Sequence, residues 1–120
     1  MQTREIPKSE WPAFVNSFSS RHQGWVVDVE VLGPEIGAQV EGRGLVLQGL
    51  TGDWDEMNRN SISIMAGNRP ADHVTHSING PTGISLEKTD SGIEVALSIM
   101  GEDGTRTLLT FPSFTRTWRM

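Results

Sequence analysis

The 120-residue sequence predicts a mainly β (α+β) fold, an antiparallel meander of about seven to eight strands after one N-terminal amphipathic helix. Three observations predict it. Apolar residues near the N-terminus recur with the period of a helix. From Trp25 onward they alternate with polar residues, which is typical of half-buried strands. Short segments rich in glycine, proline, asparagine and aspartate separate the alternating runs.

The helix is expected over about residues 9–23. Ser9 is a good N-cap residue, and Gly24 suits the position just beyond the C-terminus. Four residues fall on one face and form an apolar stripe: Trp11, Phe14, Val15 and Phe18. We expect the stripe to pack against the sheet, with an exposed ligand platform as the alternative.

Strands are expected at about residues 25–32, 36–43, 45–50, 60–66, 72–78, 82–88, 93–100 and 105–111, with a tail over 112–120. Gly42 and Gly44 suggest a bend or bulge between the second and third strands. In the second strand, Ala38 and Val40 are predicted to point inward. The short turns imply antiparallel pairing, and all elements form a single domain over 1–120.

A meander of this length tends to curl, since closure into a barrel removes exposed strand edges. We therefore predict a barrel or strongly bent sheet, with the helix plugging one end or lying across one face. An open sheet packed on the helix is the alternative.

Composition excludes several classes of protein. The chain has no cysteine, which excludes disulfides, thiolate metal sites and cysteine nucleophiles and fits a reducing compartment. The N-terminus is polar, unlike a signal peptide, and no apolar run approaches the ~20 residues of a membrane span. We expect a cytoplasmic protein.

The net charge of −5 makes nucleic-acid binding unlikely, although Arg106, Arg116 and Arg119 follow the last acidic residue of the sequence.

Asp72, His73 and His76 are the candidate catalytic residues, because carboxylate and imidazole groups serve as metal ligands and as bases near neutral pH. On a strand, however, His73 and His76 point to opposite faces, and only a helical turn or bulge would bring them together. We therefore expect no metal site and no cofactor. If His76 is a structural residue on the inward face, its ring needs a partner from another strand or from a ligand.

The longest predicted loop holds Asp53, Trp54, Asp55 and Glu56. It lacks the residue order of an EF-hand calcium loop, so a solvated loop is the better interpretation. Trp54, expected to be exposed, and Trp118 in the tail are possible partner contacts, because tryptophan is favoured in binding hot spots. Phosphate-binding loops, hydrolase elbows and zinc-protease helices have no counterpart in the sequence.

Several blocks resemble a bacterial family of small proteins known only as a domain of unknown function. They are Arg4-Glu5-Ile6-Pro7, Trp11, Trp25, the run from Leu32 to Gly37, the run from Asp72 to His76, and a last strand ending near Leu109 and Phe111. The resemblance covers roughly residues 3–111 and leaves the tail outside. It implies a bacterial cytoplasmic protein and no particular activity.

Three classes of function stay open. The first is a non-enzymatic binding or interaction module, expected to be a homodimer because a meander leaves strand edges and the tail carries Phe114 and Trp118. The second is a small enzyme or metal protein that uses Asp72, His73 and His76. The third is a carrier that holds a small apolar ligand inside a β-barrel.

Overall fold

The computed structural model of the protein describes residues 1–55, 57 and 59–112. Its elements are, in chain order, β1 (Gln2–Glu5), the 3-10 helix η1 (Lys8–Glu10), α1 (Trp11–His22), β2 (Val26–Gly33), β3 (Gly37–Asp53), β4 (Ser61–Ala66), the 3-10 helix η2 (Pro70–Asp72), β5 (Val74–Asn79), β6 (Pro81–Lys88), β7 (Glu94–Gly101) and β8 (Arg106–Thr110). The mainly β prediction with one N-terminal helix is confirmed.

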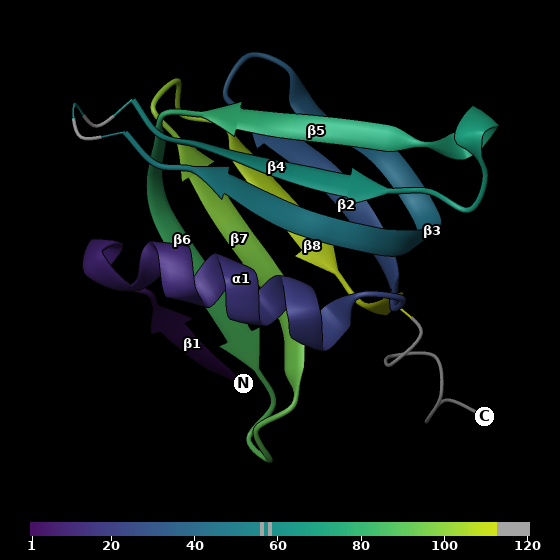
Figure 1. Ribbon diagram of the computed structural model, residues 1–120, viewed down its shortest axis with the longest axis horizontal. Helices are drawn as coiled ribbons and strands as arrows, with labels where there is room; N and C mark the ends of the chain where they lie inside the picture. Colours follow the sequence, from purple (N-terminus) through teal and green to yellow (C-terminus); the bar gives the residue numbers. More distant parts are fainter. Residues whose placement is uncertain (56, 58, 113–120) are drawn as a thin grey trace.

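The strands form one sheet in the order β1-β6-β7-β8-β2-β3-β4-β5, and all neighbours are antiparallel. The sheet bends strongly, so that β4 and β5 lie over one end of its concave side while α1 lies across the other (Figure 1). β1 and β5 do not pair, so the sheet is bent rather than closed. The barrel alternative is therefore wrong.

The bend lies within β3, whose first part pairs with β2 and whose second part pairs with β4. The register against β2 shifts twice near Val29, and Gly44 adopts φ +64°, a left-handed conformation that favours glycine. Gly42 and Gly44 thus mark an irregularity, as predicted. The chain stays in one strand through it, so the separate strands expected at 36–43 and 45–50 are a single element.

The prediction that Ala38 and Val40 point inward is wrong. Val40 pairs with Glu30, whereas the buried residue of β2 at that level is its neighbour Val31. Directly paired residues share a face, so Val40 lies on the outer face and is 46% exposed. The register shift inverts the alternation, because moving one residue along a strand reverses the face.

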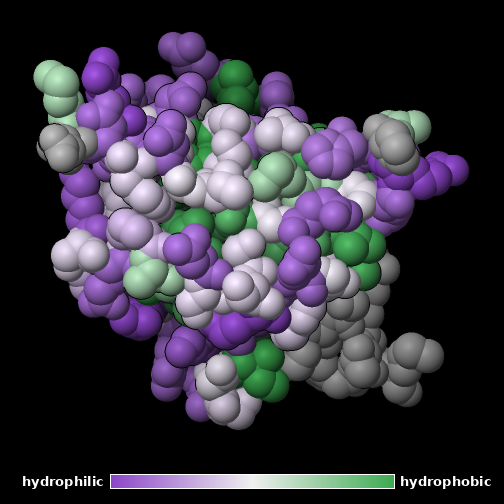
Figure 2. Space-filling model, viewed as in Figure 1, coloured by the Kyte–Doolittle hydropathy of each residue, from purple (hydrophilic) through white to green (hydrophobic). Residues whose placement is uncertain are grey.

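The N-terminal helix begins at Trp11, later than predicted, because Ser9 belongs to the 3-10 turn η1. Glu10 occupies the N-cap, but its side chain makes no capping hydrogen bond to the helix. The apolar stripe is buried as predicted: Trp11, Phe14, Val15 and Phe18 are at most 9% exposed. From the side of α1 the surface is mostly hydrophilic, with narrow apolar strips (Figure 2).

The edge strand β1 has no counterpart in the predicted set. It pairs with β6, from which residues 6–80 separate it in the chain, and all four of its residues are exposed. Ile6 follows it into the core, where its N–H donates to the Ile84 carbonyl at 2.9 Å. The Trp11 indole N–H donates to the Ile6 carbonyl at 2.9 Å, which ties the strand to the start of α1.

Replacing Phe14 by alanine should destabilise the fold by about 3–5 kcal/mol, because it removes a buried aromatic ring from the contact between helix and sheet. Urea unfolding measures the effect. Asn16→Ala, on the exposed face of the same helix, is the control and should stay within about 0.5 kcal/mol of wild type. Equal stability of the two variants would contradict the packing of α1 against the sheet.

Candidate functional site

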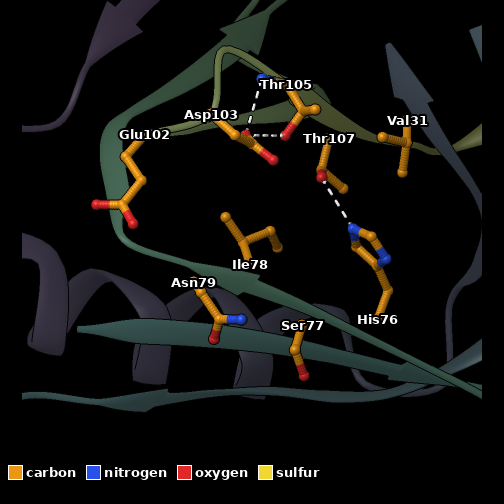
Figure 3. A pocket seen from close by; sticks show the side chains of 9 residues that line it. All are labelled: Val31, His76, Ser77, Ile78, Asn79, Glu102, Asp103, Thr105 and Thr107. Atoms are coloured by element: carbon orange, nitrogen blue, oxygen red, sulfur yellow. Dashed lines mark hydrogen bonds between the residues drawn. The ribbon is translucent and has the colours of Figure 1, made fainter. Parts of the chain in front are cut away.

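A pocket of about 270 Å³ lies where the edge strand β5 approaches the turn between β7 and β8. Nine residues line it: Val31, His76, Ser77, Ile78, Asn79, Glu102, Asp103, Thr105 and Thr107 (Figure 3). Four of them are consecutive in β5. Since successive strand residues point to opposite faces, the pocket wraps around the free edge of β5.

His76 points from β5 toward β8. Burial alternates along β5, with Val74, His76 and Ile78 on the inner side. His76 Nε2 and Thr107 Oγ1 form a hydrogen bond of 3.1 Å, and Thr107 is 2% exposed. The partner of this imidazole thus comes from another strand, and the bond joins the two layers of the bent sheet at the pocket.

Asp103 contributes a carboxylate to the same pocket (Figure 3). Its Oδ1 accepts hydrogen bonds from the Thr105 hydroxyl at 2.6 Å and the Thr105 backbone N–H at 3.0 Å. These bonds favour the charged form and hold the pKa of Asp103 below its ordinary value. The polar lining of the pocket therefore includes the His76 imidazole and a carboxylate, that of Asp103, which is ionised at neutral pH.

Asp72 and His73, the other two candidates, do not join this site. Residues 70–72 form a 3-10 turn, so β5 begins at Val74 rather than at 72. Asp72 Oδ2 accepts a hydrogen bond of 3.1 Å from Arg69 Nε, and His73 is exposed. Within residues 1–55, 57 and 59–112, no three His, Asp or Glu side chains gather as metal ligands would.

Trp54 is half-buried, so the expectation of an exposed tryptophan is wrong. Its ring packs at 6.5 Å from that of Trp11 and lies against the backbone of Gly52. The lack of a Cβ at Gly52 makes room for the indole, because a Cβ there would lie 2.1 Å from it. Trp54 therefore packs against the core, and its role as a partner contact stays a prediction.

In the acidic loop, Asp55 organises a local turn. Its carboxylate accepts hydrogen bonds from the Met57 N–H at 2.7 Å and from Arg59 Nε at 3.0 Å. In β8, Arg106 Nε lies 3.3 Å from Met100 Sδ. The remaining residues of these predictions lie outside the described part of the chain: Glu56, Phe114, Arg116, Trp118 and Arg119.

The sequence did not single out His22, which is 2% exposed. Its ring packs against Phe18, Trp25 and Phe111, and Nδ1 donates to the Phe18 carbonyl at 2.9 Å. Burial lowers the pKa of His22 below its ordinary value. Its position one helical turn after Phe18 places it on the apolar stripe and could have indicated that it is buried. A histidine near the C-terminus of a helix is equally typical of a positive charge that interacts with the helix dipole.

Thr105→Val should raise the pKa of Asp103 toward its ordinary value of 3.8, because it removes the shorter of two hydrogen bonds to the carboxylate. A carboxyl ¹³C NMR titration of wild type and variant measures the change. Thr82→Val, on a hydroxyl that donates to a backbone carbonyl, is the control. An unaltered titration of Asp103 in Thr105→Val would show that the hydroxyl does not set its charge.

Asp103 also links the stability of the fold to pH. A carboxyl group whose pKa is lower in the folded state stabilises the fold above its unfolded pKa. That contribution is lost as the pH falls from about 3.8 through the lower folded value.

Comparisons with known proteins place the chain in a family. A protein with 28% identity over 109 residues, covering 91% of each chain, is an uncharacterized protein of the bacterium Aquifex aeolicus (strain VF5). No solved structure matches. The profile of a family of unknown function, DUF5335, matches residues 2–116, which takes the similarity past the 3–111 expected from the sequence blocks and into the tail. The chain therefore belongs to the DUF5335 family.

Proposed function

We propose that the protein is a non-enzymatic interaction module of the cytoplasm, and that it works as a homodimer joined along the free edge of β5. The observation that carries the proposal is the character of this edge. β5 offers six residues, Val74–Asn79, without a charged side chain, a proline or a break in register against β4. Exposed edges of this kind are templates for pairing with another strand.

The backbone of β5 has groups available for such pairing. The hydrogen bond of 2.9 Å from the Gly80 N–H to the Asn60 carbonyl sets the phase of the β4–β5 ladder. Every second residue of β5 therefore bonds to β4, and the residues between direct their N–H and C=O groups away from it. Those residues are Thr75, Ser77 and Asn79.

The opposite edge of the sheet is protected. β1 has only four residues and carries Arg4 and Glu5, and short charged edges resist pairing. A two-fold axis beside β5 and perpendicular to the strand would extend the sheet antiparallel into a second copy, and two-fold dimers are the commonest closed assemblies. The partner strand would lie across the mouth of the His76 pocket.

The arrangement supports the other two classes less well. Asp72 bonds to Arg69 and His76 bonds to Thr107, while His73 is exposed, so the three have separate surroundings. Inside the bend, buried side chains of α1 and of the sheet make one continuous apolar cluster among the described residues, so protein side chains occupy the place where an apolar ligand would lie. Among the described residues, no helix is long and apolar enough to span a membrane.

The dimer is tested with two lysine variants that remove the same hydrogen bond. Ser63 Oγ and Ser77 Oγ are 2.9 Å apart on paired residues of β4 and β5. Ser77→Lys places a charge on the free edge, where two-fold pairing brings it near its own copy. Ser63→Lys places the same charge on β4, which is the neighbour of the edge strand and is not at the edge itself. Light scattering should give twice the 13.2 kDa chain mass for wild type and Ser63→Lys, and the single mass for Ser77→Lys.

If the wild-type protein has the mass of one chain at all concentrations, the proposed dimer is wrong. If Ser77→Lys remains a dimer, the interface does not lie along β5. Circular dichroism of both variants establishes that each remains folded, so that a change in mass reports on the edge alone.

A further inference from the structure

The hydrogen-bond phase of β5 restricts how a second copy can pair with this strand, and the inference drawn from it rests on the dimer proposed above. In an antiparallel pair, two residues that exchange backbone hydrogen bonds stand directly opposite each other. The residues of β5 whose backbone groups point away from β4 are Thr75, Ser77 and Asn79, so these residues face the same set in the second copy. A two-fold axis therefore lies level with a residue of β5 and never midway between two neighbours.

One position of the axis uses the whole free edge. With the axis at Ser77, this residue faces its own copy, and Thr75 faces Asn79 on both sides of the axis. Moving the axis by one residue in either direction leaves Thr75 or Asn79 opposite a residue outside β5. One of those outside residues is Pro81, which has no N–H to donate. The axis at Ser77 therefore gives the largest number of backbone hydrogen bonds.

The position of the axis also determines which side chains meet on the inner face of β5. Directly opposite residues share a face, so Ile78 of the second copy stands opposite His76, and His76 of the second copy stands opposite Ile78. The two imidazoles are then diagonal neighbours, whereas an axis at His76 would set them directly against each other. Each His76 keeps its hydrogen bond to Thr107 of its own chain in this arrangement.

We propose that the two-fold axis of the dimer lies at Ser77 and that the second copy completes the His76 pocket. His76 and Ile78 both line this pocket, which lies beside the free edge of β5 (Figure 3). Pairing at Ser77 places Ile78 of the second copy opposite His76, where it adds an apolar wall on the side of that edge. By symmetry the pockets of the two copies lie side by side across the axis.

Cysteine cross-linking tests the position of the axis, since the chain has no cysteine of its own. Opposite residues that exchange hydrogen bonds have Cα atoms about 5.5 Å apart, a distance that a disulfide can bridge. Under mild oxidation, Ser77→Cys should therefore give a covalent dimer on a non-reducing gel. Thr75→Cys and Asn79→Cys are the matched controls, and each should give none, because each cysteine faces the other position rather than its own copy.

The double variant Thr75→Cys/Asn79→Cys should cross-link, because its cysteines face each other between copies and lie too far apart along one extended strand to join within a chain. If the wild type is a dimer by light scattering but Ser77→Cys cross-links no better than Thr75→Cys, the axis at Ser77 is wrong and the dimer stands. If the wild type has the mass of one chain, both the dimer and this axis are wrong.

Diethyl pyrocarbonate, which modifies accessible imidazoles, tests whether the second copy completes the pocket. Mass spectrometry of peptides should show that His76 reacts more slowly in the wild-type dimer than in the Ser77→Lys monomer. His22, which is 2% exposed in the core, is the control and should react equally slowly in both. Equal reaction of His76 in the two proteins would show that the second copy does not cover the pocket.

Discussion

The fold depends on covering the concave face of one bent sheet. A sheet with an apolar inner face cannot leave that face in water, because each large apolar side chain buried contributes about 1.5–3 kcal/mol. The protein covers the face in two ways. Helix α1 lays its aromatic stripe over one part, and the sheet folds over itself, through β4 and β5, to cover the rest. Phe18, fully buried, sits where the helix meets Phe111 at the end of β8.

The bend that makes this cover possible also creates the features with functional interest. Because β3 leaves β2 to pair with β4, the first part of β3 has one unpaired side, and Val40 there and Ile36 just before the strand are nearly half exposed. For the same reason β5 ends the sheet opposite β8 without pairing with it as a neighbouring strand. The bond between His76 and Thr107 bridges this gap, and the polar pocket occupies the rest of it.

Periodicity predicted most of the elements, because it reports directly which side chains are buried. It failed where burial and pairing are decided by distant partners. The edge strand β1 carries no apolar alternation, and its pairing with β6 is invisible locally. The register shift near Val29 inverted the faces of Ala38 and Val40. Trp54 was misjudged because its polar neighbours suggest a solvated loop, whereas its ring reaches Trp11.

The candidate sites were less predictable than the fold. His76 was singled out as an inward histidine in need of a partner, but Thr107 lies on a strand that the alternation could not place beside it. Residues with ordinary surface composition become a site only through such packing.

The strand order constrains how the chain acquires its structure during synthesis. β2 is made early, yet one of its two neighbours is β8, the last strand of the sheet. β1 is made even earlier, and it has no partner strand until β6 has been made. Non-local pairings of this kind form slowly because long loops must close first. A ribosome-bound chain therefore exposes one edge of β2 unpaired until β8 has been made, and that interval is when a chaperone or a neighbouring nascent chain has access to it.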